Sequence, residues 1–86
     1  MIRIGYAPSF LRQVKTLSGE LQAEAVEKIA VFVDEKSHKT LKVHKLKGRL
    51  VGRHSFSINY RYRIVFKYIA KKEAILLAIG DHDVYR

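Results

Sequence analysis

The chain has 86 residues, with 17 Lys or Arg against 8 Asp or Glu, and no cysteine. This length predicts one domain over residues 1–86. The absence of cysteine excludes disulfide scaffolds, thiolate zinc sites and cysteine nucleophiles. No apolar run approaches the ~20 residues that span a bilayer, so we expect a cytoplasmic protein with no membrane partner. The net charge of +9 favours a polyanionic partner.

A short strand followed by two helices is expected in the first half of the chain. Residues 2–6 alternate apolar side chains with others, which indicates a strand. Pro8 suits the first turn of a helix. Ser18 or Gly19 can start a second helix, which we expect to run to Glu35. Its apolar stripe is formed by the residues that recur at helical spacing, namely Leu21, Ala25, Val26, Ile29, Ala30 and Val33.

The second half of the chain changes to a period of two, which is typical of strands. After a basic loop at residues 36–50, strands are expected over residues 53–58, 61–68 and 73–79, joined by short turns. The last strand is nearly all apolar, which suits a central strand covered on both faces. The order β-α-α-β-β-β predicts an α+β fold, with an antiparallel sheet and two N-terminal helices packed on one face.

The positive charge is concentrated in one part of the chain. Residues 36–67 contain ten Lys or Arg and no Asp or Glu. If Phe56, Ile64 and the other apolar residues of these strands pack under the helices, alternation places the strand arginines on the opposite, open face. A sheet face carrying arginines is expected to bind a phosphodiester backbone.

Metal-free RNA cleavage needs few groups, and the chain has them. A base removes the ribose 2′-OH proton, a cation stabilises the phosphorane, and an acid protonates the departing 5′-oxygen. The residues that can supply these groups are His44, Arg63, His82, Tyr85 and several lysines. Two other histidines are read as structural or solvated: we expect His54 to be a satisfied core or edge histidine and His38 to be solvated.

A metal site has weak support. One cluster combines a histidine with two carboxylates near the end of the chain, at residues 81–83, and such clusters are usually solvated ends. No phosphate-binding loop, dinucleotide fingerprint or paired-histidine helix motif is present. We therefore expect no metal and no cofactor.

Two motifs in the second half resemble those of a known family. The segment Leu-Lys-Gly-Arg-Leu-Val-Gly at residues 46–52, then Ser55, then Tyr-Arg-Ile-Val-Phe at residues 62–66 resemble the RelE/ParE superfamily of bacterial toxins. The chain looks nearest to the YafQ, YoeB and RelE-like mRNA interferases of type II toxin-antitoxin systems. The resemblance implies a RelE-like fold and a ribosome-dependent endoribonuclease that inhibits translation.

The resemblance also implies roles for individual residues. His44 would be the general base, Arg63 would stabilise the scissile phosphate, His82 would be the general acid, and Tyr85 would orient or stack on a base. Which of His82 and Tyr85 donates the proton stays open. The residues implied to hold the RNA are Lys45, Lys47, Arg53 and Arg61.

The partners implied are a cognate antitoxin, mRNA on the ribosome, and operator DNA, the last as the toxin-antitoxin complex only. An acidic antitoxin segment would lie across the basic groove. Two alternatives remain: a ParE-type toxin that inhibits gyrase, and a non-catalytic interaction protein on the same fold. The combination of His44, Arg63, His82 and Tyr85 favours the nuclease, because a gyrase binder has no chemical need of it.

Overall fold

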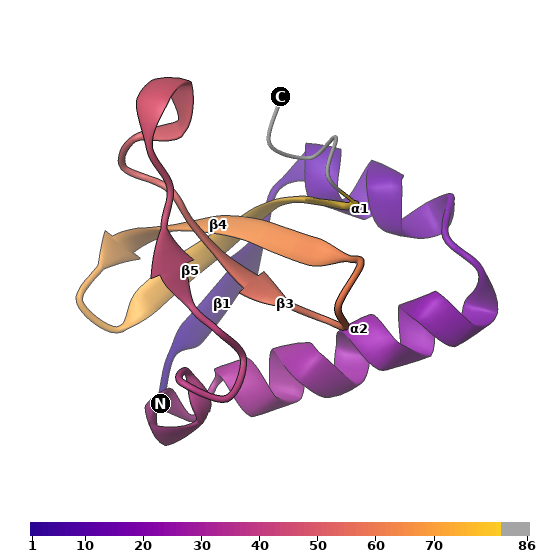
Figure 1. The fold of residues 1–86 in the computed structure, drawn as a ribbon, viewed down its shortest axis with the longest axis horizontal. Helices are drawn as coiled ribbons and strands as arrows, with labels where there is room; N and C mark the ends of the chain where they lie inside the picture. Colours follow the sequence, from indigo (N-terminus) through magenta and orange to yellow (C-terminus); the bar gives the residue numbers. More distant parts are fainter. Residues whose placement is uncertain (82–86) are drawn as a thin grey trace.

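The computed structural model describes residues 1–81, in which two helices and two 3₁₀ turns accompany five strands (Figure 1). The helical segments are α1 (Pro8–Lys15), α2 (Gly19–Phe32), η1 (Glu35–Ser37) and η2 (Gly48–Leu50). The strands are β1 (Arg3–Tyr6), β2 (His44–Lys45), β3 (His54–Ser57), β4 (Arg63–Ala70) and β5 (Glu73–Gly80). The α+β class and the order of the main elements are as predicted.

The five strands form one mixed sheet in the order β1-β5-β4-β3-β2. Strands β2 to β5 pair antiparallel, whereas β1 pairs parallel to β5. The expectation of a wholly antiparallel sheet is therefore wrong at this edge. No hairpin joins β1 to β5, since both helices and the other strands lie between them in the chain, so nothing forces the pair to be antiparallel. Strand β2 was not expected, because two residues are too few to show a period.

Helix α1 satisfies backbone groups of β5 beyond the point where β1 ends, at Tyr6. The Ser9 hydroxyl donates to the carbonyl of Leu77 at 2.7 Å, and the amide of Ile79 donates to the Gln13 side-chain oxygen at 2.8 Å. Because buried backbone groups need partners, these two bonds replace the sheet ladder that β1 no longer provides. They fix α1 against the second half of β5, as Figure 1 shows.

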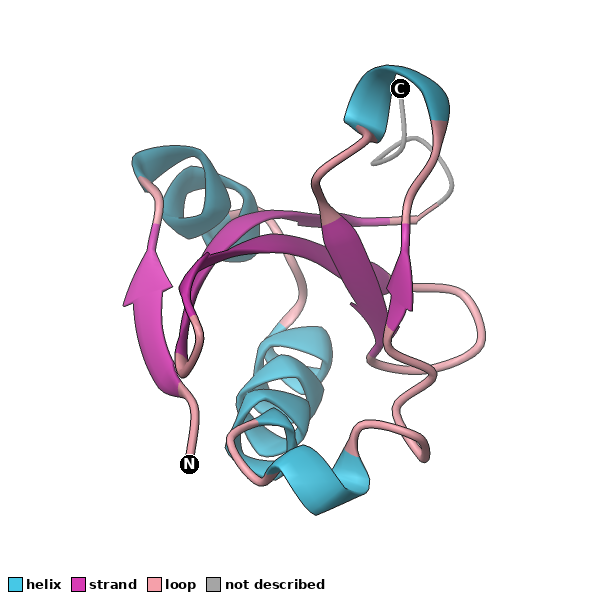
Figure 2. Cartoon of the chain, turned by 90° about the vertical axis from the view of Figure 1, so that its left-hand side faces the viewer, coloured by secondary structure: helices cyan, strands magenta, loops and turns pink. Residues whose placement is uncertain are grey.

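Helix α2 lies under one face of the sheet (Figure 2) and begins as predicted, with the Ser18 hydroxyl accepting the amide of Leu21 at 3.2 Å. Its buried residues are Ala25 and Phe32. They join Phe10 of α1 and the inward side chains of the sheet in one hydrophobic core. Both helices therefore contribute to the core on the same side of the sheet, in agreement with the prediction.

The apolar stripe expected for α2 is partly wrong, because Val26 is 67% exposed whereas Phe32 is fully buried. The Phe32 ring lies between those of Phe56 and His38, at centroid distances of 4.5 and 4.6 Å, with the edge of Phe66 4.7 Å away. This aromatic packing turns the helix face that carries Phe32 toward the sheet. His38, expected to be solvated, is instead half-buried and stacked on Phe32, and its Nε2 donates to the Phe32 carbonyl at 2.7 Å.

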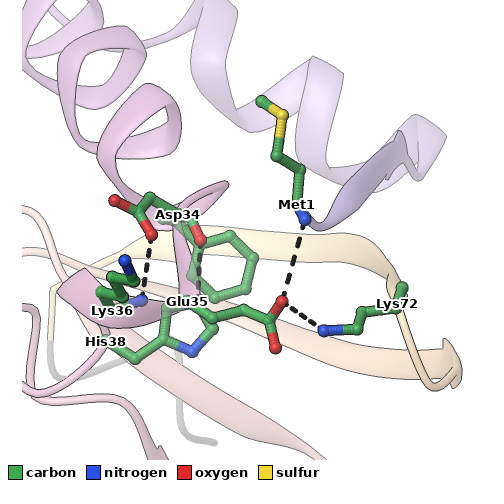
Figure 3. A network of polar contacts seen from close by, with 7 residues as sticks. Met1, Asp34, Glu35, Lys36, His38 and Lys72 are labelled. Atoms are coloured by element: carbon green, nitrogen blue, oxygen red, sulfur yellow. Dashed lines mark hydrogen bonds and ion pairs between the residues drawn. The ribbon is translucent and has the colours of Figure 1, made fainter.

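The acidic residues that follow α2 connect segments instead of extending the helix to Glu35 as expected (Figure 3). The Asp34 carboxylate accepts the amide of Lys36 at 3.1 Å and so starts η1. The Glu35 carboxylate accepts a hydrogen bond from Lys72 at 2.6 Å and lies 3.8 Å from the ammonium of Met1. The Lys72 hydrogen bond lowers the pKa of Glu35. These contacts link the end of α2 to the β4–β5 turn and to the residues before β1.

Candidate active site on the open face of the sheet

Strand register brings several predicted site residues onto the sheet face opposite α2. One row across the strands consists of His44, Ser55, Val65 and Ala78. The next row consists of Ser57, Arg63 and Gly80. With ordinary strand spacing, the Cα atoms of His44 and Arg63 lie about 12 Å apart, on strands that flank β3. The two long side chains can therefore approach one phosphodiester group placed between them.

The contacts of His44 determine which ring nitrogen carries the proton. Its Nδ1 lies 2.9 Å from the carbonyl oxygen of Lys42. Because a carbonyl only accepts, Nδ1 is the donor, and Nε2 of the neutral ring has a free lone pair. The Ser55 hydroxyl lies 3.3 Å from Nε2 and donates to it in this tautomer. His44 is exposed and Ser55 is buried. The Lys42 carbonyl and the Ser55 hydroxyl therefore orient the imidazole ring from the sheet, and Nε2 can act as a base.

The residue that orients His44 has an unusual backbone conformation. Lys42 has a φ of +59°, the one positive φ outside glycine among residues 1–81. A non-glycine residue pays a strain cost of order 1 kcal/mol or more there, and such residues gather at functional sites. Nothing in the sequence signals it, since lysine has no preference for left-handed backbone. Sequence reasoning therefore missed the support of His44.

The Arg63 guanidinium is held by the turn between β3 and β4. Its Nη1 donates to the carbonyl oxygens of Asn59, at 2.6 Å, and Tyr62, at 3.1 Å. The Asn59 side chain accepts from the amides of Arg61 and Tyr62 and donates to the Glu24 carboxylate of α2 at 2.8 Å. Nη2 and Nε of Arg63 make no hydrogen bond within residues 1–81. These N–H groups can bind phosphate oxygens from a fixed position.

Two of the residues predicted to hold RNA do not share this face. Lys45 is in register with His54, whose neighbour Phe66 belongs to the core, so Lys45 lies on the helix side of the sheet at its edge. Arg61 precedes β4, in the turn, with its guanidinium 5.7 Å from the centroid of the Tyr62 ring. Both are exposed, but neither is placed beside His44 by strand register.

Lys47 and Arg53 flank η2 at the tip of the β2–β3 hairpin, which projects on the side of the sheet away from α2 (Figure 2). Gly48 and Gly52 have φ values of +68° and +89°, a conformation that suits glycine. The two glycines of the motif at residues 46–52 thus form this tip. The hairpin places exposed cations at one end of the open face.

Within the described residues 1–81, the basic segment at residues 36–67 forms no ion pair with an acidic side chain. Within residues 1–81, the cations that form ion pairs are the ammonium of Met1 and the side chains of Arg3, Lys28 and Lys72. None of them belongs to residues 36–67. A segment rich in cations without ion pairs favours a polyanion. The predicted residues His82 and Tyr85 lie outside the described residues; β5 ends at Gly80, which is paired with Arg63.

His54, expected to be a satisfied core or edge histidine, is half-buried and packs against the core residue Phe66, but it is not satisfied at Nδ1. Its ring stacks on Phe66 at 5.4 Å and meets the edge of Tyr68 at 5.1 Å. Its Nδ1 is buried without a hydrogen-bond partner in the part of the chain that the structure describes. Burial, followed by the charge of Lys45 and that of His44, lowers the pKa of His54. The folded protein therefore favours the neutral ring.

This lowered pKa predicts a loss of stability in mild acid. Below the ordinary histidine pKa of about 6.5, the unfolded chain binds a proton at His54 while the folded protein does not. The free energy of unfolding therefore decreases as the pH is lowered from about 6.5 to the lower pKa of the folded state. Above about pH 6.5 both states hold His54 neutral, and its contribution to the free energy of unfolding is fully present. Urea denaturation between pH 5 and 8 measures it, and His54→Phe should show a shallower decline. Identical slopes in the two proteins would contradict this origin.

No three His, Asp or Glu side chains gather as possible metal ligands in residues 1–81. In the same residues, no helix is long and apolar enough to cross a membrane. The chemistry available on the described open face is thus that of an oriented imidazole, a buried hydroxyl and a fixed guanidinium.

No protein-family model matches the chain, and no curated protein matches it in sequence. Solved structures do match. A conserved hypothetical protein from Helicobacter pylori has a TM-score of 0.75 at 19% identity, over 100% of both chains. The YoeB–YefM complex from Staphylococcus aureus contains a chain with a TM-score of 0.72 at 19% identity, over 95% of this chain and 98% of that one.

YafQ from E. coli strain BL21(DE3) matches with a TM-score of 0.71 at 14% identity, over 96% of both chains. At these identities the similarity concerns the fold. The chain has the RelE/ParE fold, which confirms the fold expected from its motifs. More particularly, it has the fold of the YoeB and YafQ structures.

Proposed function

We propose that this protein is the toxin of a type II toxin-antitoxin pair and that it cleaves mRNA on the ribosome without a metal ion. The observation that carries the proposal is the sheet face on which an oriented His44 lies one row from the fixed guanidinium of Arg63. The cations of residues 36–67, which lack ion pairs within residues 1–81, support RNA as the ligand. The fold shared with YoeB and YafQ supports the toxin assignment.

In the proposed reaction, Nε2 of His44 removes the proton of the ribose 2′-OH. The 2′-oxygen then forms a bond to the adjacent phosphorus, and the bond from phosphorus to the 5′-oxygen breaks. The free N–H groups of Arg63 stabilise the charge that grows on the phosphorane oxygens. His82 or Tyr85 protonates the departing 5′-oxygen, which leaves a 2′,3′-cyclic phosphate and a 5′-hydroxyl. The contact of Ser55 with Nε2 is long, at 3.3 Å, so the 2′-OH can replace it at little cost.

The proposed partners follow from the charge of the face. An acidic antitoxin segment would compete with RNA for the same cations and would thereby neutralise the toxin. The ribosome would supply much of the positioning of the mRNA, so activity on free RNA should be weak. Operator DNA would be bound by the toxin-antitoxin complex and not by the toxin alone.

Induction of the protein in growing bacteria tests this function. We expect growth arrest, new mRNA 5′ ends within translated regions, and no DNA damage response. His44→Ala should lose both the arrest and the new ends, whereas Lys71→Ala, a change of an exposed lysine in the β4–β5 turn, should keep both. Intact mRNA together with an induced damage response would show a gyrase-directed toxin instead.

A further inference from the structure

A pocket of about 390 Å³ lies beside the proposed active site. Its walls come from α2, from the loop at residues 40–42 and from the end of β3 with the turn that follows it. The volume lies within the ~300–1,000 Å³ usual for ligand sites. The proposed reaction makes no use of this space.

The pocket shares its walls with the supports of both proposed catalytic residues. Lys42 lines it, and the carbonyl of Lys42 holds His44. Asn59 lines it too, and the carbonyl of Asn59 holds Arg63. A group bound in the pocket would therefore contact the residues whose carbonyls hold His44 and Arg63.

The lining combines an aromatic ring, hydroxyls and cations. Tyr60 is 90% exposed, so the face of its ring is open to a stacking partner. The hydroxyls of Thr40 and Ser57 make no hydrogen bond within residues 1–81. Lys42 has no ion pair there, and Lys28 has one, to Glu27 at 3.5 Å. These groups match the three parts of a nucleotide, which are a flat base, polar edges with a ribose, and a phosphate.

We propose that this pocket binds one unpaired nucleotide of the RNA chain, adjacent to the cleaved phosphate. The base stacks on Tyr60, the hydroxyls of Thr40 and Ser57 bond to its polar groups, and Lys28 and Lys42 hold its phosphate. An acidic peptide would use the two cations but would leave the exposed ring without a function, so the lining favours a nucleotide. The inference rests on the proposed function and adds the site that selects and places the substrate.

An NMR titration of ¹⁵N-labelled protein with a single-stranded trinucleotide tests the pocket directly. The trinucleotide carries 2′-O-methyl groups, so that no 2′-OH remains to attack. We expect amide shifts at residues 40–42 and 57–60 that saturate together. Shifts confined to other parts of the protein would overturn the proposal.

Variants at the ring and at one cation sharpen the test. Tyr60→Ala should weaken trinucleotide binding about tenfold or more, whereas Tyr60→Phe keeps the stacking face and should restore most of the affinity. Lys42→Asn removes the charge with a residue that tolerates left-handed backbone, and should lower the salt dependence of binding by about 0.7 in the logarithmic slope. Lys71→Asn is the matched control and should leave the shifts at the pocket unchanged.

The outcomes separate this inference from the function on which it rests. If His44→Ala abolishes mRNA cleavage in cells while Tyr60→Ala binds the trinucleotide like the wild type, the pocket proposal is wrong and the function stands. If the wild type cleaves no mRNA, the function fails, and the titration still decides whether a nucleotide occupies the pocket. If Tyr60→Ala weakens the antitoxin complex but not the trinucleotide complex, the pocket is a protein-docking site and the proposal is overturned.

Discussion

Replacing Arg63 with alanine is expected to slow mRNA cleavage on the ribosome about 10²- to 10³-fold, the usual effect of removing a donor to a developing anion. The size follows from the geometry of the side chain. Its Nη1 is fixed by two carbonyl oxygens of the β3–β4 turn, so the remaining N–H groups point from a preorganised position and need no reorientation during the reaction. Single-turnover cleavage on ribosomes programmed with one defined mRNA measures the rate.

A lysine at the same position separates charge from geometry. Arg63→Lys keeps the positive charge but cannot be held by the turn through one nitrogen while presenting others to a phosphate, so it should recover only part of the lost rate. Arg12→Ala, on the exposed side of α1, removes one cation from the chain and should leave the rate near that of the wild type. Equal losses in Arg63→Ala and Arg12→Ala would mean that net charge, and not a fixed guanidinium, drives the activity. Urea denaturation of each variant controls for the hydrogen bonds to the turn.

The elements with a sustained period were predictable, and those fixed by tertiary contacts were not. The alternation around Ile64 and Phe66 located β4 to within two residues at each end, because a half-buried strand leaves a clear pattern. On α2, two adjacent apolar stripes are available, and periodicity cannot choose between them. Packing of Phe32 against Phe56 and Phe66 in the strands determines which of the two stripes faces the sheet. Sequence reasoning included Val26 in the stripe and omitted Phe32 because those partners are far away in the chain.

In the candidate site, too, some residues were predictable from the sequence, whereas the contacts that orient them were not. Sequence motifs pointed to His44 and Arg63, and the structure places both on the open face. The contact of His44 with Ser55 depends on the register of β2, a strand too short to be read from a pattern. The carbonyl that fixes the tautomer comes from a lysine whose left-handed backbone has no sequence signal. Asn59 lies in the short turn expected between residues 58 and 61, but its bonds to α2 and to the backbone around Arg63 depend on the packed fold.

The second large effect is expected in the core, where Phe32→Ala should lower the free energy of unfolding by about 3–5 kcal/mol. Phe32 is fully buried, and its ring contacts aromatic rings on three sides, so the change removes both buried area and packing partners. A chain of this length has a total stability of about 4–13 kcal/mol, so the variant should be close to unfolding. Urea denaturation followed by circular dichroism measures the loss.

A matched change on the same helix identifies which side of α2 faces the sheet. Val26→Ala also shortens an apolar residue of α2, but at an exposed position, and should change the stability by no more than about 0.5 kcal/mol. If the two variants lost equal stability, the helix would face the sheet along the stripe that contains Val26. The difference bears on the proposed site, because Phe56, which stacks on Phe32, is the neighbour of Ser55 in β3. Loss of Phe32 should therefore lower activity by unfolding the strand that carries the support of His44, and the activity of the fraction that remains folded should be unchanged.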